Sequence, residues 1–362
     1  MEPVYETLEV SSVATEDVIS SMPDNVITHI LDRLPIQYAV RTSILSRNWR
    51  FKWTMLSQVV FDYDFFEYLL GPDHIINYDA RHLSRLLHFN GAITKFVLYI
   101  PSFDLLDFED IHHWVMLLSR KGIKDFTLIS ENDMLFKLPT HFFSCLELKH
   151  LTLYNCHIRP PPSFHGFPNL LNLVLCYVTF EGSGCMDLIR GCPLLEILRI
   201  PNFHPIGTLK LDGIARLKNL KILSFSLREL DNNVIKCSCI FRLVGFLPKL
   251  QELGLTLLMG ETLEIMAIYE NDVPPPAICF SEIHCNSMGR LQLRSVEFTH
   301  VRGSKNEICL IEWLLASSPL LEKMVIHFDP IVVFGGDDGK YKFARKLLKL
   351  QRASPIAQLK LK

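Results

Sequence analysis

The segment most similar to a nucleotide-binding loop is Gly335-Gly-Asp-Asp-Gly-Lys340. A P-loop uses the backbone N–H groups of a Gly-x-x-x-x-Gly-Lys-Ser/Thr sequence to hold phosphates, and its final hydroxyl to hold magnesium. Here the glycine-to-lysine spacing is one residue short, and Tyr341 stands in the place of Ser or Thr. We therefore expect a turn over 335–340 and no nucleotide cofactor.

Pairs of histidines and cysteines are the other candidates for chemistry, because these side chains bind metals and act in catalysis. Cys237-Ser-Cys239 and His284-Cys285 are too closely spaced, and they lack the second ligand pair of a zinc module. His112-His113 lies in an expected helix, where a packed or solvated pair is commoner than a metal ligand. No Gly-x-Ser-x-Gly sequence is present. The sequence thus predicts a protein that is not an enzyme and that needs no metal or cofactor.

The composition argues against several classes of protein. Acidic side chains number 39 and basic ones 37, so the chain lacks the basic excess that nucleic-acid binding requires. No apolar run approaches the ~18 residues needed to cross a bilayer. The N-terminus is acidic and lacks the basic and apolar segments of a secretory signal. With ten scattered cysteines, typical of reduced thiols, we expect an intracellular protein, cytoplasmic and/or nuclear, with no nucleic-acid or membrane partner.

Leucine accounts for 57 of the 362 residues, and much of it falls in a repeated Leu-x-x-Leu-x-Leu frame. One strand and one helical return in ~20–29 residues is the leucine-rich-repeat unit, whose leucines are buried against neighbouring units. No copy is recognised between Met1 and Tyr63. Nine copies begin 22 to 43 residues apart, with first anchors at Ile93, Ile123, Leu148, Leu170, Leu195, Leu220, Leu250, Leu293 and Leu321.

Proline precedes several copies, as in Gly191-Cys-Pro-Leu-Leu-Glu196. Because proline cannot continue a helix, it marks the step from a helix into the next strand. The predicted fold class is α/β: an irregular leucine-rich-repeat solenoid, with a curved parallel sheet and a helical convex side, over 63–288. Further repeats occupy 289–362, where the basic segment 342–352 is expected to be the closing helix. The alternative, a different α/β fold with a parallel sheet, gives no reason for a fixed leucine frame.

The first sixty residues have a helical pattern instead. An apolar stripe at i, i+3, i+4 and i+7 predicts a helix that begins near Pro23. A second short helix is expected around Val40, and a third from Ser46, with Trp49 and Trp53 on one face. Three short helices make a poor core alone. The stripe therefore belongs either to a surface that a partner completes or to a helical cap on the solenoid.

Several segments resemble one family. Residues 22–35 are similar to an F-box, with Met22 where that motif usually has leucine, and 43–53 are similar to the ending common in plant F-box proteins. The order of these parts over nearly the whole chain resembles the plant F-box/FBD/LRR-repeat proteins. The matching later segments are 91–98 and 114–128 for the family's early repeats, and 314–322 and 343–355 for its FBD region.

The resemblance implies a substrate receptor of an SCF-type cullin-RING ubiquitin ligase. After an acidic tail over 1–15, an F-box over 16–62 would dock on a Skp-type adaptor and through it a cullin, while the repeats bind a protein target. By position in the motif, adaptor binding or its supporting core would fall to Met22, Pro23, Ile27, Ile30, Leu31, Leu34, Pro35, Leu45 and Trp49. An apolar helix stripe laid into a partner's groove fits that role. The alternative is a repeat scaffold without ligase function, which would bind no adaptor.

Strand alternation predicts the face that binds the target, because residues between inward leucines point to the concave side. On that face we expect contacts from His150, Tyr154, Asn172, Arg199 and Glu252. The face is mixed and nearly neutral, which favours a folded protein or peptide held by packing and hydrogen bonds. Tyr154 and Arg199 are the expected anchors, since Tyr and Arg are enriched at binding hot spots. The alternative is that a loop such as 271–288 binds the target.

Overall fold

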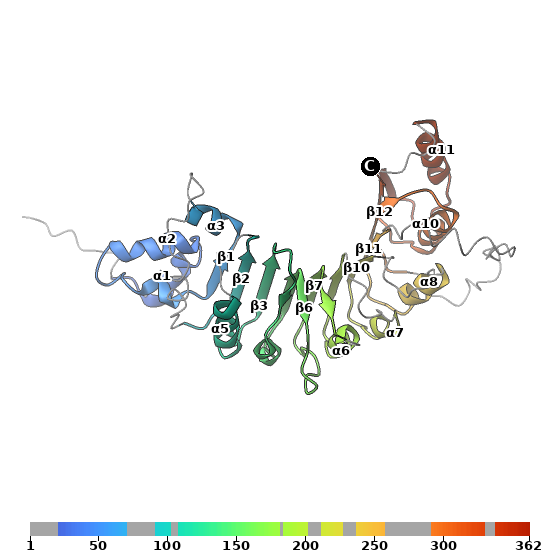
Figure 1. Ribbon diagram of the computed structural model, residues 1–362. Helices are drawn as coiled ribbons and strands as arrows, with labels where there is room; N and C mark the ends of the chain where they lie inside the picture. The colour runs from blue at the N-terminus through green and yellow to red at the C-terminus, as the bar shows by residue number, and fades with distance from the viewer. Residues whose placement is uncertain are drawn as a thin grey trace, which may run out of the picture.

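A single parallel sheet that bends into an arc dominates the chain (Figure 1). The computed structural model describes residues 21–70, 91–102, 108–181, 184–201, 211–226, 237–257, 291–329 and 337–362. In this part of the chain the sheet has eleven strands, hydrogen-bonded in sequence order. They are β1 (Gln58–Phe61), β2 (Lys95–Ile100), β3 (Asp125–Ser130), β5 (His150–Tyr154), β7 (Asn172–Cys176), β9 (Ile197–Ile200), β10 (Ile222–Ser226), β11 (Glu252–Thr256), β12 (Ser295–Val301), β13 (Lys323–Phe328) and β14 (Gln358–Leu361).

The inward anchors of successive strands lie opposite one another. Phe126 of β3 pairs with Leu151 of β5, which pairs with Leu173 of β7. These three side chains are buried, and the same row continues to Met324 of β13. Each repeat therefore completes the core of its neighbour, as a solenoid requires. All nine predicted copies form strands of this sheet, and the predicted curved parallel solenoid is confirmed.

Two strands of the main sheet were missed by the sequence analysis, as was the small second sheet. The statement that no copy precedes Tyr63 is wrong, because Leu56, Val59 and Phe61 complete the leucine frame in β1 and are buried. At the other end, β14 pairs with β13 and closes the sheet after the basic helix. Its frame begins with Ile356, which is 65% exposed and so does not act as a core anchor.

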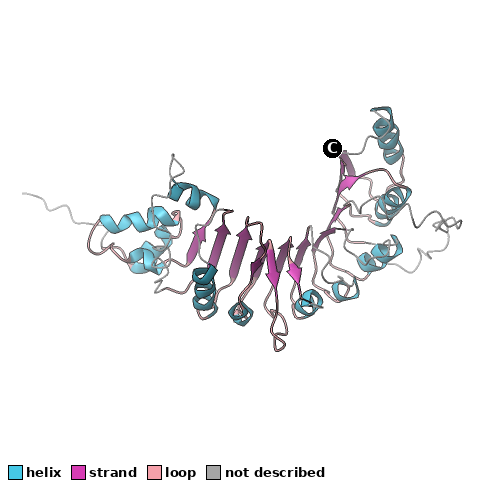
Figure 2. Cartoon of the chain, in the orientation of Figure 1, coloured by secondary structure: helices cyan, strands magenta, loops and turns pink. Residues whose placement is uncertain are grey.

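Most of the helices and turns that connect the strands lie on the outer side of the arc, whereas the helix that follows β1 lies above the strands in this view (Figure 1 and Figure 2). Residues 337–340, expected in a turn, instead begin the helix α11. Gly335 and Gly336 lie outside the described residues, as do 271–288.

Among the described residues, no helix combines the length and the apolar character needed to span a bilayer. The connecting elements are α3 (Tyr63–Leu70), α5 (Phe108–Ser119), η4 (Thr140–Ser144), α6 (Gly184–Arg190), α7 (Leu211–Ile214), α8 (Cys237–Gly245), α10 (Lys305–Ser317) and α11 (Asp337–Leu348), and a small second sheet of β4 (Phe136–Lys137), β6 (Cys156–Ile158) and β8 (Thr179–Phe180).

The N-terminal end of the arc carries two α-helices, α1 (Asp24–Leu31) and α2 (Ile36–Arg41), followed by the 3₁₀ turns η1 (Thr42–Ile44) and η2 (Lys52–Met55). The expected third α-helix from Ser46 is wrong. The backbone makes successive three-residue hydrogen bonds there, from Trp49 to Ser46 (3.1 Å) and from Lys52 to Trp49 (3.2 Å), so tight turns replace helical ones. Trp49 is buried and Trp53 partly buried, so both still serve the core.

These N-terminal helices are bonded to the sheet. The Asp32 carboxylate, just after α1, accepts hydrogen bonds from the Ser57 N–H (2.9 Å), the Ser57 hydroxyl (2.6 Å) and the Gln58 N–H (3.3 Å), at the start of β1. The Gly91 N–H donates to the Thr54 carbonyl. One buried cluster contains apolar side chains of both the helices and the repeats. The two parts therefore share a core.

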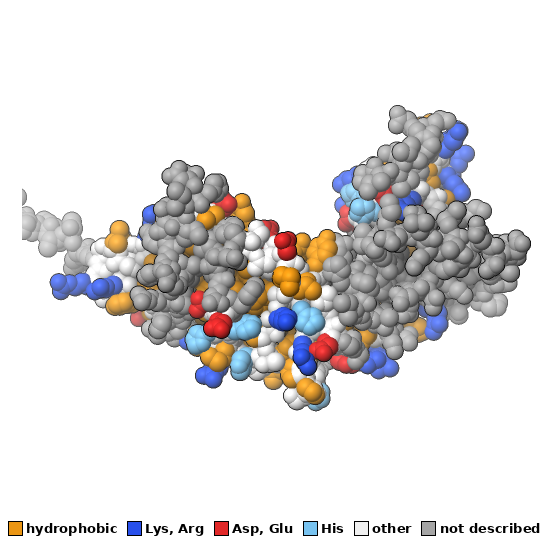
Figure 3. Space-filling model, in the orientation of Figure 1, with side chains coloured by type: hydrophobic (Ala, Val, Ile, Leu, Met, Phe, Trp, Pro, Cys, Tyr) orange, Lys and Arg blue, Asp and Glu red, His pale blue; other side chains and the backbone are white. Residues whose placement is uncertain are grey.

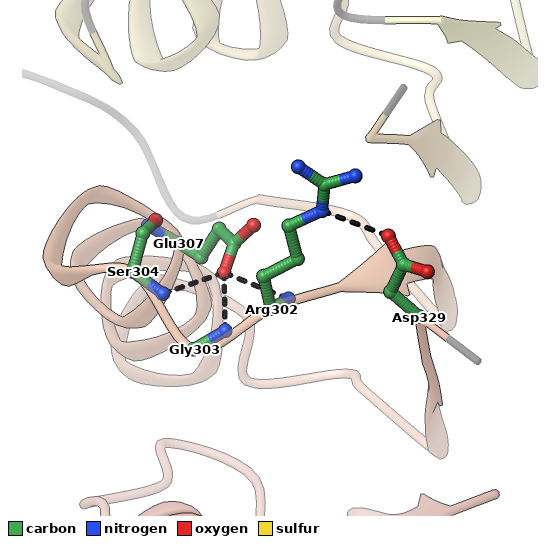
Figure 4. Close-up of polar contacts among 5 residues, drawn as sticks. All are labelled: Arg302, Gly303, Ser304, Glu307 and Asp329. Atoms are coloured by element: carbon green, nitrogen blue, oxygen red, sulfur yellow. Dashed lines mark hydrogen bonds and ion pairs between the residues drawn. The ribbon is translucent and has the colours of Figure 1, made fainter. Parts of the chain in front are cut away.

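The C-terminal end is fixed by a polar cluster around α10 (Figure 4). Ser304 caps the helix by accepting from the Glu307 N–H (3.2 Å). The Glu307 carboxylate accepts in return from the N–H groups of Arg302 (3.1 Å), Gly303 (2.7 Å) and Ser304 (2.8 Å). Arg302 also pairs through Nε with the buried Asp329 carboxylate at 2.8 Å. These contacts bind α10 to the ends of β12 and β13.

Candidate functional site

Exposed apolar side chains are concentrated in the N-terminal helices. Of the sixteen large apolar side chains that are exposed in the described part of the chain, seven fall within residues 26–51. They are Val26, Ile30, Leu34, Tyr38, Ile44, Leu45 and Phe51. Single exposed apolar residues are ordinary, but such a concentration marks an interaction surface.

The predicted apolar stripe consists of two adjacent rows. Ile27 and Leu31 are 2% and 0% exposed and pack in the core. Ile30 and Leu34 are 41% and 39% exposed, and Val26 precedes Ile30 by one helical turn on the same face. One row therefore anchors the helix, while the other faces outward. Sequence reasoning missed Val26, although its spacing to Ile30 was visible in the sequence.

The remaining residues that the resemblance assigned to adaptor binding divide in the same way. Trp49 is buried, and Met22 packs partly buried against the core. Leu45 is 62% exposed. Pro23 and Pro35 are exposed and directly precede α1 and α2, where a proline suits the start of a helix. Ile44 and Phe51, which the sequence analysis did not select, are more exposed than Leu45.

Positive charge surrounds this apolar surface. Residues 21–57 contain five Lys or Arg side chains and two Asp side chains. Lys52 is paired with Asp24, and Asp32 is engaged by β1. The Arg50 guanidinium lies 5.6 Å from the centre of the Phe51 ring. A partner that covers this surface should therefore be apolar at its centre and acidic at its rim.

The second candidate surface is the concave face of the sheet. All five residues predicted to bind the target occupy positions between buried anchors and are exposed or half-buried. His150 and Asn172 lie directly opposite each other in neighbouring strands, and Arg199 lies opposite Val174. Glu252 is four strands away from His150, about 19 Å at ~4.8 Å per strand. The five residues therefore form a line along the face and do not form a compact pocket.

Asn172 has an unused polar atom on this face. Its Oδ1 is buried and has no hydrogen-bond partner among the described residues. A buried polar group without a partner costs ~1–3 kcal/mol. Because this atom is buried, a ligand on the concave face could reach it only if the Asn172 side chain moved.

Tyr154 belongs to one of two tyrosine pairs that the sequence analysis did not anticipate. Its ring meets Tyr177 edge to face at 5.3 Å, and Tyr63 of α3 meets Tyr99 of β2 in the same way at 5.6 Å. Tyr177 has a left-handed backbone (φ 51°), which is uncommon for a bulky residue and occurs at functional sites. Burial, then a hydrogen bond to Glu131, raises the pKa of Tyr99. Of these four tyrosines, only Tyr99 and Tyr154 could have been placed from the sequence, because both occupy corresponding positions near the ends of repeat strands.

Comparison with known proteins agrees with this division into helices and repeats. The F-box domain model matches residues 19–59, and the model "FBD-associated F-box protein At5g56370, LRR repeats" matches residues 111–253. The F-box/FBD/LRR-repeat protein At1g13570 of Arabidopsis thaliana is 29% identical over 95% of this chain and 98% of its own length. The FBD-associated F-box protein At5g38590 of the same plant is 32% identical over 51% of this chain and 44% of its own length.

A solved structure is also similar, more distantly. It is the LRR ectodomain of the plant membrane receptor kinase GASSHO1/SCHENGEN3 from Arabidopsis thaliana, in complex with CASPARIAN STRIP INTEGRITY FACTOR 2. The identity is 20%, the match covers 65% of this chain and 24% of that one, and the TM-score of 0.31 is too low to support any conclusion. The two family models and the full-length relative confirm the resemblance to the plant F-box/FBD/LRR-repeat proteins: this chain combines a segment that matches the F-box domain with a segment that matches the family's leucine-rich repeats.

Proposed function

We propose that this chain is the substrate-recognition subunit of an SCF-type cullin-RING ubiquitin ligase. Its F-box helices bind a Skp-type adaptor, which connects the chain to a cullin. The concave face of the repeats binds the protein that is to be ubiquitinated. The chain itself performs no chemistry, because ubiquitin transfer belongs to its partners, and it works inside the cell, where those partners are found.

One observation carries the proposal: the outer row formed by Val26 and Ile30 of α1 and by Leu34, just after it, is exposed while the inner row is fully packed. A helical cap on a solenoid has no need of an exposed apolar row. A groove in a partner would remove these side chains from water, at ~25 cal/mol per Å² of apolar area covered. The basic residues around the row favour an adaptor with acidic side chains at its edge.

The concave face supports the other half of the proposal. Its candidate contacts extend about 19 Å across neighbouring strands, a length suited to a protein surface or an extended peptide. Tyrosine and arginine, the side chains most enriched at hot spots, are both present in Tyr154 and Arg199. The repeats thus present a face for a target at a fixed place relative to the F-box.

The test is to co-express the full-length chain with a Skp-type adaptor and a cullin, and to purify the chain by an affinity tag. We expect both partners to co-purify in stoichiometric amounts, and the Ile30→Ala, Leu34→Ala double variant to recover clearly less of them. The double variant is preferable to deletion of the first sixty residues, because that deletion would remove most of β1 and expose the core. Recovery of a folded wild-type chain without adaptor would refute the proposal and favour a scaffold without ligase function.

A further inference from the structure

A groove of about 610 Å³ opens among the outer connections, lined by α5, β4, η4 and β6. Its polar lining is almost entirely basic or imidazole: His112, His113, Lys137, His141, His157 and Arg159. Among the described residues that line it there is no Asp or Glu. Histidine, lysine and arginine side chains are visible beneath the middle strands on the face drawn in Figure 3.

Successive repeats bring these residues together. Lys137 in β4 lies directly opposite His157 in β6, in the small second sheet. The His157 Nδ1 is hydrogen-bonded to the Thr179 hydroxyl at 2.8 Å, which fixes the ring and leaves Nε2 as the atom available to a ligand. His112 reaches across from α5 and donates from Nε2 to the Lys137 carbonyl at 3.3 Å. The groove is thus held by backbone pairing and two ring contacts.

The donor set fits an oxyanion better than a metal. In the described part of the chain, no three His, Cys, Asp or Glu side chains come together in a way that could hold a metal ion. Imidazole, ammonium and guanidinium groups all donate hydrogen bonds, and donors from several elements suit the three terminal oxygens of a phosphate group. A carboxylate, with two oxygens in one plane, would use fewer of these donors.

The size and the floor of the groove favour a peptide over a free ion or a nucleic acid. A volume of about 610 Å³ holds a segment of several atoms beyond a single phosphate group. Met116, Leu138 and Pro139 line the same groove and offer apolar contact to flanking side chains. Stacking of bases needs aromatic platforms, and none is among the lining residues apart from the imidazoles.

We infer that this groove binds a phosphorylated serine or threonine in a peptide segment of a protein partner. Lys137 and His141 contact the phosphate oxygens. His157 and Arg159 lie at the side of the groove that is nearest the loop beginning at Pro160. Arg159 is also paired with Glu181 at 2.7 Å, so its charge is shared. Binding of the phosphorylated segment does not depend on the proposed function. Only the role of this partner as a ubiquitination target rests on it.

The probe is a fluorescein-labelled pool of peptides with phosphoserine at one position and randomised flanking residues. Matched pools carry serine or glutamate at that position, and a single-stranded RNA 12-mer serves as a competing class. Fluorescence anisotropy with the purified full-length chain should show binding of the phosphoserine pool at least about tenfold tighter than of the serine pool, because charge-assisted hydrogen bonds are the strong ones.

The Lys137→Gln, His141→Gln double variant should lower the affinity for the phosphoserine pool about tenfold or more. Both side chains are exposed, so the melting temperature should not change. Lys149→Gln removes one exposed charge outside the groove and should leave binding unchanged. Equal binding of the phosphoserine and serine pools, an unaffected double variant, or tighter binding of the RNA would overturn the inference. Adaptor co-purification is measured on the same variants, so the failure of one proposal is distinguishable from the failure of the other.

Discussion

Adjacent residues of α1 should separate stability from adaptor binding. Leu31 is 0% exposed, so Leu31→Ala should lower the free energy of unfolding by ~2–5 kcal/mol through lost burial and a cavity. Ile30 and Leu34 are 41% and 39% exposed, so Ile30→Ala with Leu34→Ala should change the unfolding free energy by much less, about 0.5 kcal/mol per site.

The effect on adaptor binding should be the reverse, because the double variant removes side chains that the adaptor would cover. Full burial of a large aliphatic side chain is worth ~1.5–3 kcal/mol, so covering the exposed two-fifths of Ile30 and of Leu34 is worth roughly 0.6–1.2 kcal/mol each. The double variant should therefore bind the adaptor about 7- to 50-fold more weakly. Calorimetric titration gives the affinity, and urea unfolding gives the stability.

Leu194→Ala is the matched control, because Leu194 is a leucine of similar exposure, 45%, in a repeat. It should leave adaptor affinity unchanged. The reasoning fails if the Ile30 and Leu34 double variant binds the adaptor within twofold of the wild type, or if Leu194→Ala weakens binding equally. It also fails if the double variant is as unstable as Leu31→Ala, since the outer row would then be part of the core.

Four further changes have defined outcomes. Asp32→Ala removes the acceptor of three hydrogen bonds from the start of β1 and should cost ~1.5–3 kcal/mol in urea unfolding. Glu307→Ala leaves three backbone N–H groups without their carboxylate and should lower the melting temperature at a cost of ~1–3 kcal/mol. Gly191→Ala would place a Cβ 1.8 Å from the His165 carbonyl oxygen, so the backbone must shift, and limited proteolysis should become faster. Burial raises the pKa of the Cys145 thiol from 9.0 to about 12; its stabilising effect is complete below pH ~9 and is lost as the pH rises toward 12, so Cys145→Ala should flatten the fall in unfolding free energy from pH 9 to 10 by ~1 kcal/mol.

The repeat strands were predictable because the signal is redundant. The same alternation recurs with anchors that must meet their neighbours, so an error in one copy does not hide the rest. The first and last strands of the sheet, β1 and β14, were not predicted for a related reason. β1 follows directly after the helical segment, and β14 begins its frame with the exposed Ile356, so neither copy has the features of an inner repeat.

The candidate sites were less predictable, because a helical stripe does not say which of its rows a neighbouring element covers. Ile27 and Leu31 differ in exposure from Ile30 and Leu34 because η2, which follows α2 in the sequence, packs on one side of α1. The basic groove could not be predicted from the sequence for another reason. His112 and His157 are far apart in the sequence and meet only because the outer connections of successive repeats lie side by side.

Rigid attachment of the F-box to the repeats has a consequence for the proposed ligase. A flexible linker would let a bound target move over many positions relative to the adaptor. Here the Asp32 carboxylate is bonded to the start of β1, and β1 pairs with β2 as the first strand of the sheet. A side chain at Gly91 would lie 2.8 Å from the Met55 carbonyl oxygen, so the chain can approach η2 this closely only at glycine. The concave face that we propose for target binding is thus held at a set distance and angle from the exposed row that we propose for adaptor docking. Whichever lysines of the target lie nearest the ubiquitin-transfer site are selected by that geometry, and a variant that loosens the junction should broaden the set of modified lysines before it reduces target binding.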